Sequence, residues 1–104
     1  MTAKTYRKKP VEIQAVFWDG TASGATPIID WVLSHGGSAR YLDPQPEHRF
    51  ETGAVLEAED EPSLSVKTLE GWIKYPPDYV FIRGVQGEFY ACEGGIFAAT
   101  YEPV

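Results

Sequence analysis

Two glycines in the C-terminal half constrain the fold most, because each falls where an apolar run reverses direction. Residues 63–75 reverse at Gly71, and residues 79–92 reverse at Gly87. Both connections fit a type I turn closed by a glycine in the left-handed conformation, a common form of β-hairpin. The sequence therefore predicts two successive antiparallel hairpins, joined by a tight corner at Pro76-Pro77-Asp78.

Strand patterns are found both within and outside these hairpins. Residues 79–82 are apolar throughout, which indicates a central strand covered on both faces. Residues 11–18 alternate at first and then become apolar on both faces, so this strand should also be covered on both sides in its second half. Residues 39–42 predict a strand that ends at a proline-containing loop. A last short strand is expected at residues 100–101.

One helix is expected between the strands at residues 11–18 and 39–42. Thr26 is a good N-cap residue and Pro27 suits the first helical position, while Gly36-Gly37 supplies a stop. A helix of about ten residues is marginal alone in water, so packing must hold it. Residues 96–99 predict one further helical turn.

These elements predict an α+β fold with about five to seven antiparallel strands. We expect a single domain over residues 1–104, built as a small curved antiparallel β-sheet or a partly open β-barrel with one short helix. If the sheet closes, a partly open barrel is the expected form, because it hides strand edges that would otherwise template aggregation.

Charge is unevenly distributed along the chain. Residues 1–10 hold four basic residues and no acid, whereas residues 11–104 hold all 15 acids and five of the nine bases. We expect a solvated basic tail at residues 1–10 and a mobile acidic loop at residues 57–62. Such an acidic body repels phosphate backbones, so nucleic acid is not an expected partner.

Other sequence features concern the compartment and cofactors. No apolar stretch approaches the roughly 20 residues that span a bilayer, and no apolar run follows the N-terminal lysines, so a cytoplasmic protein without a membrane partner is expected. The single cysteine, Cys92, and the two histidines form no metal-ligand motif, and no phosphate-binding glycine motif occurs. We therefore expect no metal and no cofactor, and no catalytic residue is assigned.

The aromatic content gives the clearest indication of a binding face. Nine of the 14 aromatic residues are Trp or Tyr, which carry polar tips that a purely structural core does not need. An aromatic wall with a polar pair, Arg83 and Glu88 across the second hairpin turn, is the candidate ligand or partner site. Its residues are Trp18, Trp72, Tyr75, Tyr79, Arg83, Glu88 and Tyr90. The competing interpretation is that these aromatic residues are core and that Arg83 and Glu88 form an ordinary cross-strand ion pair.

The two ends of the chain carry a distinctive set of segments. They are residues 6–11 (YRKKPV), 13–15 (IQA), 17–20 (FWDG), 80–90 (VFIRGVQGEFY) and 97–103 (FAATYEP). In these segments the chain resembles a family of small, mostly uncharacterised proteins from bacteriophages and prophages. Family members begin with a YRKKPV-like segment and end with a PGDWIIRGVKGEFYPCKPDIFEKTYE-like segment. This chain departs from the pattern at Pro77, at Ala91 and at residues 93–95, and residues 21–62 are not covered.

The resemblance implies a phage protein made inside a bacterial cell, with no catalytic residues to carry over. We expect a non-enzymatic accessory protein that binds a host protein or a small molecule, one version being sequestration of a defence-signalling nucleotide. The alternatives are a small hydrolase using Glu88 or Asp78, and a minor virion component. A homo-oligomer is left open. If the candidate residues converge on one cavity, a small ligand is favoured; if they scatter, a flat protein-binding surface is favoured.

Overall fold

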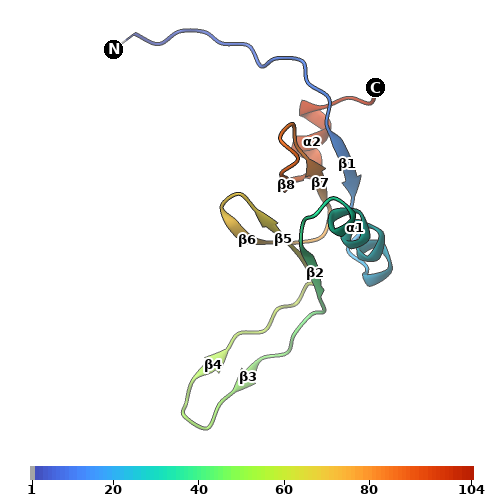
Figure 1. Cartoon of the computed structure of the whole chain (residues 1–104). Helices are drawn as coiled ribbons and strands as arrows, with labels where there is room; N and C mark the ends of the chain where they lie inside the picture. The colour runs from blue at the N-terminus through green and yellow to red at the C-terminus, as the bar shows by residue number, and fades with distance from the viewer. Residues whose placement is uncertain (1) are drawn as a thin grey trace.

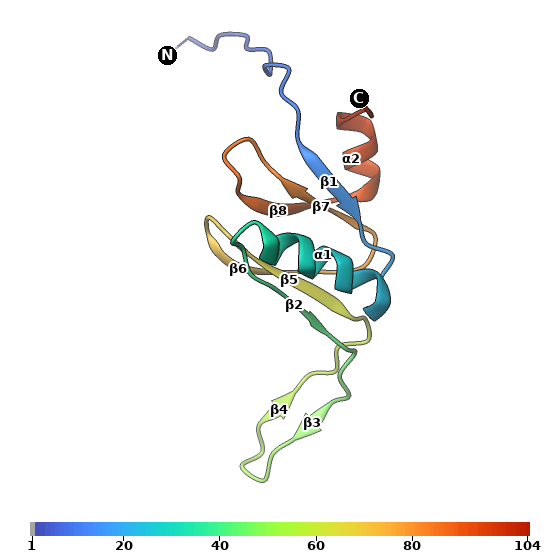
Figure 2. The same cartoon turned by 45° about the vertical axis from the view of Figure 1, so that its right-hand side comes forward.

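The computed structural model describes residues 2–104, and its elements follow one another as shown in Figures 1 and 2. In chain order they are β1 (Gln14–Phe17), α1 (Ala22–Ser34), β2 (Ala39–Leu42), β3 (His48–Arg49), β4 (Val55–Leu56), β5 (Ser63–Thr68), β6 (Gly71–Tyr75), β7 (Tyr79–Arg83), β8 (Phe89–Glu93) and α2 (Gly94–Thr100).

The strands form two antiparallel three-stranded sheets and a separate two-stranded ribbon. The sheet orders are β1-β7-β8 and β2-β5-β6, and β3 pairs with β4. The α+β class is therefore confirmed. Of the two forms expected, the small antiparallel sheet is the one found, and the strands within residues 2–104 form no closed barrel. The Pro76-Pro77 corner explains the division, because prolines lack the N–H donors that would continue a ladder from β6 into β7.

Both predicted hairpins are confirmed. Strands β5 and β6 pair around a reversal that ends at Gly71, whose φ is +106°. Strands β7 and β8 pair around a reversal at Gly87, whose φ is +79°. Positive φ is accessible to glycine without the steric cost that a Cβ atom brings. The central position of β7 is also confirmed, since Val80, Phe81 and Ile82 are all buried.

Helix α1 begins five residues earlier than the sequence predicts. Thr21 is the N-cap, and its hydroxyl accepts a hydrogen bond from the Gly24 N–H at 2.9 Å. Pro27 consequently lies inside the helix rather than at its first position. The predicted stop is confirmed, because the helix ends before Gly36, which has φ of +79°.

The core lies between α1 and the inner faces of the two sheets. It unites one face of α1 with side chains from β5, β7 and β8 and with the residue after β1. Its buried members are Trp18, Ala25, Ile28, Val32, Leu64, Val66, Phe81 and Phe89. Figure 2 shows α1 between the two sheets, which explains how one short helix can cover both.

Helix α2 covers part of the opposite face of the β1-β7-β8 sheet. The helical turn predicted at residues 96–99 is part of this longer helix. The strand predicted at residues 100–101 is wrong, because Thr100 is the last residue of α2. The Glu93 carboxylate caps the helix by accepting hydrogen bonds from the backbone N–H groups of Gly95 and Ile96, at 2.8 and 3.0 Å. These two hydrogen bonds hold the pKa of Glu93 below its usual value.

Two segments project from opposite ends of the body (Figures 1 and 2). Residues 2–10 form an extended tail, and residues 43–62, which carry β3 and β4, form a long ribbon that we call the arm. They account for the radius of gyration of 17.0 Å, because a compact chain of this length has a value of about 13 Å. Within the described residues, neither helix is long and apolar enough to cross a bilayer.

Candidate functional site

The seven predicted site residues lie in several different places. Trp18 belongs to the core: it is fully buried, and its ring meets those of Tyr41 and Phe81 edge to face, with centroids 6.2 and 6.4 Å apart. Its indole Nε1–H donates a hydrogen bond to the Thr21 carbonyl oxygen at 2.9 Å. Trp18 therefore supports the start of α1 and is not available to a ligand.

Tyr75 and Tyr79 also belong mainly to the body of the protein. Their ring centroids are 5.6 Å apart, and the Tyr75 ring lies 5.6 Å from that of Phe81. Both side chains are partly buried and pack against the core. Burial raises the pKa of Tyr75, as expected for a phenol whose charged form would be poorly solvated.

Tyr90 lies on β8, on the face that α2 partly covers. Burial, together with a hydrogen bond to the Tyr101 hydroxyl, raises the pKa of Tyr90 to about 12. The Tyr101 ring in turn stacks on Phe97 of α2, with centroids 4.8 Å apart. The polar tip of Tyr90 is thus used to join β8 to the C-terminal segment.

Arg83 and Glu88 flank the second hairpin turn without pairing. Arg83 faces Phe89 across the ladder, which moves Glu88 beyond the last paired position. Among the described residues no ion pair joins the two side chains, and the Glu88 carboxylate instead accepts a hydrogen bond from the Gln86 N–H at 3.3 Å. The expected cross-strand ion pair is therefore wrong. The Arg83 Nε is buried and has no hydrogen-bond partner.

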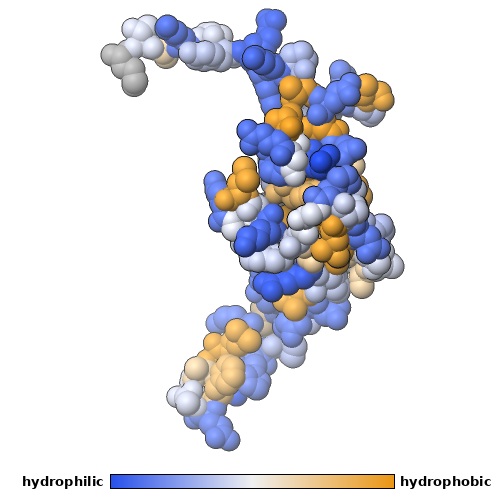
Figure 3. Space-filling model, viewed as in Figure 1, coloured by the Kyte–Doolittle hydropathy of each residue, from blue (hydrophilic) through white to orange (hydrophobic). Residues whose placement is uncertain are grey.

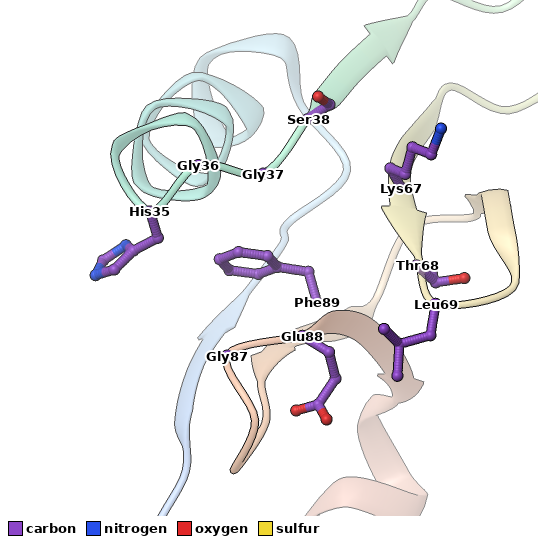
Figure 4. A pocket seen from close by; sticks show the side chains of 10 residues that line it. All are labelled: His35, Gly36, Gly37, Ser38, Lys67, Thr68, Leu69, Gly87, Glu88 and Phe89. Carbon is purple, nitrogen blue, oxygen red and sulfur yellow. The ribbon is translucent and has the colours of Figure 1, made fainter.

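Three of the seven residues do meet at one hollow. Tyr75, Glu88 and Tyr90 line a shallow depression of about 260 Å³ between β6 and β8. A neighbouring hollow of about 250 Å³ lies between the end of α1 and the two hairpin turns (Figure 4). Both are smaller than the roughly 300–1,000 Å³ that is usual for small-ligand pockets.

The polar side chains around these hollows do not converge. In Figure 4 the side chains of His35, Lys67 and Glu88 point in three different directions, and the Phe89 ring lies between them. Asp78 and Glu88, the carboxylates considered for a hydrolase, precede β7 and β8 respectively and so lie at opposite ends of that hairpin. No pair of catalytic groups is assembled by this arrangement of the described residues.

A different cluster lies on the outer face of the β2-β5-β6 sheet. Antiparallel pairing places Arg40, Ser65 and Lys74 in one row across the three strands, and Lys67 beside Trp72 in the next. These five residues point away from the core, because their neighbours Leu64 and Val66 point into it. We call this cluster the basic face.

The centre of the basic face is an arginine stacked on a tryptophan. The Arg40 guanidinium carbon lies 4.7 Å from the centroid of the Trp72 ring, within the range of a cation–π interaction. Between their strands lies Ser65, whose small side chain is buried and leaves room for Arg40 to reach across the sheet. Trp72 keeps 43% of its surface exposed.

The basic face contrasts with the charge of the rest of the chain. Arg40, Lys67 and Lys74 are three of the five bases in residues 11–104, which hold 15 acids. Lys74 pairs with Glu59 at 2.8 Å, whereas within residues 2–104 no acid lies within ion-pair distance of Arg40 or Lys67. A hollow of about 490 Å³ opens here, lined by Arg40, Trp72 and Lys74 among others.

Sequence reasoning found Trp72 but missed its neighbours. The pairing of Lys67 with Trp72 follows from the predicted hairpin register, so this much was available from the sequence. The position of Arg40 beside Trp72 could not be predicted in this way. Strands β2 and β5 are separated by the whole arm, and nothing local indicates that they pair.

Comparison with known proteins identifies no relative. No family model, curated protein or solved structure matches the chain. The resemblance to phage proteins therefore stays a prediction.

Proposed function

We propose that this chain is a non-enzymatic phage accessory protein that binds a host protein in the bacterial cytoplasm, and that the basic face is its binding surface. The observation that carries the proposal is the exposed Arg40–Trp72 stack, flanked by Lys67 and Lys74 on an otherwise acidic protein. Arginine and tryptophan are the residue types most enriched among interface hot spots. The partner's complementary surface presents carboxylates, which a guanidinium binds in two-point geometry.

A protein partner is favoured over a small molecule by the distribution of the predicted residues. Trp72 lies on the outer face of one sheet, whereas Arg83 and Glu88 flank a turn of the other. The nucleotide-binding version rested on aromatic residues gathered around Arg83, and that grouping is absent from the described residues. A broad face with one stacked pair suits a flat protein surface.

The overall charge affects how such a partner binds. The chain carries a net charge of −6, which repels an acidic partner at long range. At about 0.15 M salt this repulsion is screened beyond about 8 Å, so contact with the basic face decides the affinity. Binding should therefore depend more on the stacked pair than on electrostatic steering.

Affinity capture from bacterial lysate, read by quantitative mass spectrometry, tests the proposal with two variants. Trp72→Ala removes the stacking platform and Arg40→Glu reverses the central charge. Each should lower recovery of the captured host protein at least about tenfold, as expected when a hot-spot residue is lost. Arg49→Glu is the matched control, because Arg49 is an exposed arginine on the arm.

Equal recovery by the wild-type chain and both basic-face variants would overturn the proposed surface. Titration calorimetry against cyclic and ADP-ribose-type nucleotides distinguishes a small-molecule ligand from a protein partner. Heat that is abolished by Trp72→Ala, with no host protein captured, would replace the protein partner by a nucleotide.

A further inference from the structure

The arm is an isolated two-stranded ribbon with an exposed apolar surface. Phe50, Val55 and Leu56 are 49%, 42% and 57% exposed, and none of the core residues comes from the arm. Figure 3 shows apolar surface gathered on the arm, away from the body. Two-stranded ribbons are marginal in water, and each outer edge carries backbone groups without strand partners.

The arm is also the most acidic part of the chain. Residues 43–62 hold seven acids and one arginine. Glu47 pairs with Arg49 and Glu59 with Lys74, whereas within the described residues no ion pair involves the other five: Asp43, Glu51, Glu57, Asp60 and Glu61. A strand that added to this ribbon would be favoured by positive charge.

The tail has the complementary properties. Residues 2–10 are extended and exposed, carry four basic residues and no acid, and include Tyr6 with 86% of its surface exposed. Lys8 fixes the base of the tail, since its Nζ donates to the Tyr101 hydroxyl at 3.2 Å and lies 5.0 Å from the centre of that ring. Lys4, Tyr6 and Arg7 lie beyond this anchor.

The tail of one molecule is too short to reach the arm of the same molecule. The two segments leave opposite ends of a molecule whose longest extent is 56 Å (Figures 1 and 2). The six residues beyond Lys8 span at most about 20 Å when fully extended. The complementary arm must therefore belong to another copy.

We infer that the basic tail of one copy adds as a third strand to the acidic arm of a second copy. Strand addition gives hydrogen-bond partners to the unpaired backbone groups at an edge of the ribbon. Tyr6 covers apolar surface near Phe50 or Leu56, and the opposite charges of tail and arm make the pairing specific. The contact joins two different surfaces, so it is heterologous and builds a ring or an open chain of copies.

Sedimentation velocity on the full chain tests this inference. At low salt the wild-type protein should show a mass above the monomer that rises with concentration, and added salt should return it to the monomer because the contact is electrostatic. A monomer at every concentration in low salt would overturn the inference.

A charge exchange identifies the surfaces involved. The tail variant carries Lys4→Glu, Arg7→Glu and Lys9→Glu, which leaves the Lys8 anchor intact. The arm variant carries Asp43→Lys, Glu51→Lys, Glu57→Lys, Asp60→Lys and Glu61→Lys. These changes make the net charge of the arm positive and leave the Glu47–Arg49 and Glu59–Lys74 pairs intact. Each variant alone should be monomeric, and their mixture should assemble again because every tail meets an arm of opposite charge.

Asp30→Lys, an exposed reversal on α1, is the control and should assemble like the wild-type chain. Assembly that persists in either variant alone, or that fails to return in the mixture, would refute tail-to-arm pairing.

Discussion

At the scale of single residues, the tryptophans show how position decides what a side chain does. Trp18 is fully buried and holds the Thr21 carbonyl, whereas Trp72 is 43% exposed beneath Arg40. Trp18 directly follows β1 and packs into the core beside α1, whereas Trp72 lies within β6 on the face that alternation turns outward. Of these two residues, only Trp72 is available for binding.

Tyr90 leads to a prediction about stability at high pH. Its pKa is about 12 in the folded protein, against 10.0 for an unperturbed tyrosine. Between these two values the folded state keeps a proton on Tyr90 that the unfolded state loses. The contribution of Tyr90 to the free energy of unfolding is therefore fully present below pH 10 and is lost as the pH rises towards 12. We expect urea unfolding to give a lower free energy at pH 11 than at pH 9, with a smaller difference in Tyr90→Phe.

Tyr6→Phe provides the comparison, because the Tyr6 side chain is largely exposed. It should keep the wild-type loss of stability. An identical pH response in Tyr90→Phe and wild type would show that Tyr90 is not the group responsible.

At the scale of elements, α1 shows two start signals in competition. Thr26-Pro27 has the chemistry of a helix start, yet the helix begins at Ala22. The Asp19 carboxylate accepts hydrogen bonds from the Thr21 backbone N–H and hydroxyl, at 2.9 and 2.7 Å, and these bonds lower the pKa of Asp19. This network, with the Trp18 hydrogen bond to the Thr21 carbonyl, fixes the earlier start and leaves Pro27 inside the helix.

Pro27→Ala tests that assignment directly. Within a helix, proline lacks the N–H that would bond the carbonyl four residues earlier, at Ser23. Restoring that donor should raise the free energy of unfolding by about 1–3 kcal/mol in urea titrations. If the helix began at Pro27 instead, the same change would be neutral or destabilising. Thr26→Ala is the neighbouring control and should change stability by less than about 0.5 kcal/mol, as is usual for exposed positions.

At the scale of the whole molecule, the fold consists of a compact body with two projections. The body contains the core cluster and both three-stranded sheets, whereas the arm contributes no core residue. The arm interrupts the β2–β5 pairing only in sequence, since Leu42 and Ser63 at its two ends are register partners. The body should therefore fold without the arm.

Replacing residues 43–62 by Asn-Gly gives the corresponding prediction. The two residues would join β2 to β5 as a tight hairpin turn, for which this dipeptide is preferred. We expect native circular dichroism and a urea midpoint close to that of the wild-type chain, together with complete loss of self-assembly. An unfolded product would show that the arm belongs to the folding unit.

The local features of this protein follow from short stretches of its sequence. Gly71 and Gly87 mark chain reversals because glycine adopts positive φ without the steric cost of a Cβ atom. Residues 79–82 predict a central strand because both faces are apolar. Tertiary structure decided which distant segments meet. The pairing of β2 with β5 across the arm places Arg40 over Trp72, and the proline corner assigns β6 and β7 to different sheets. Such contacts depend on how the whole core packs, and no local pattern specifies them.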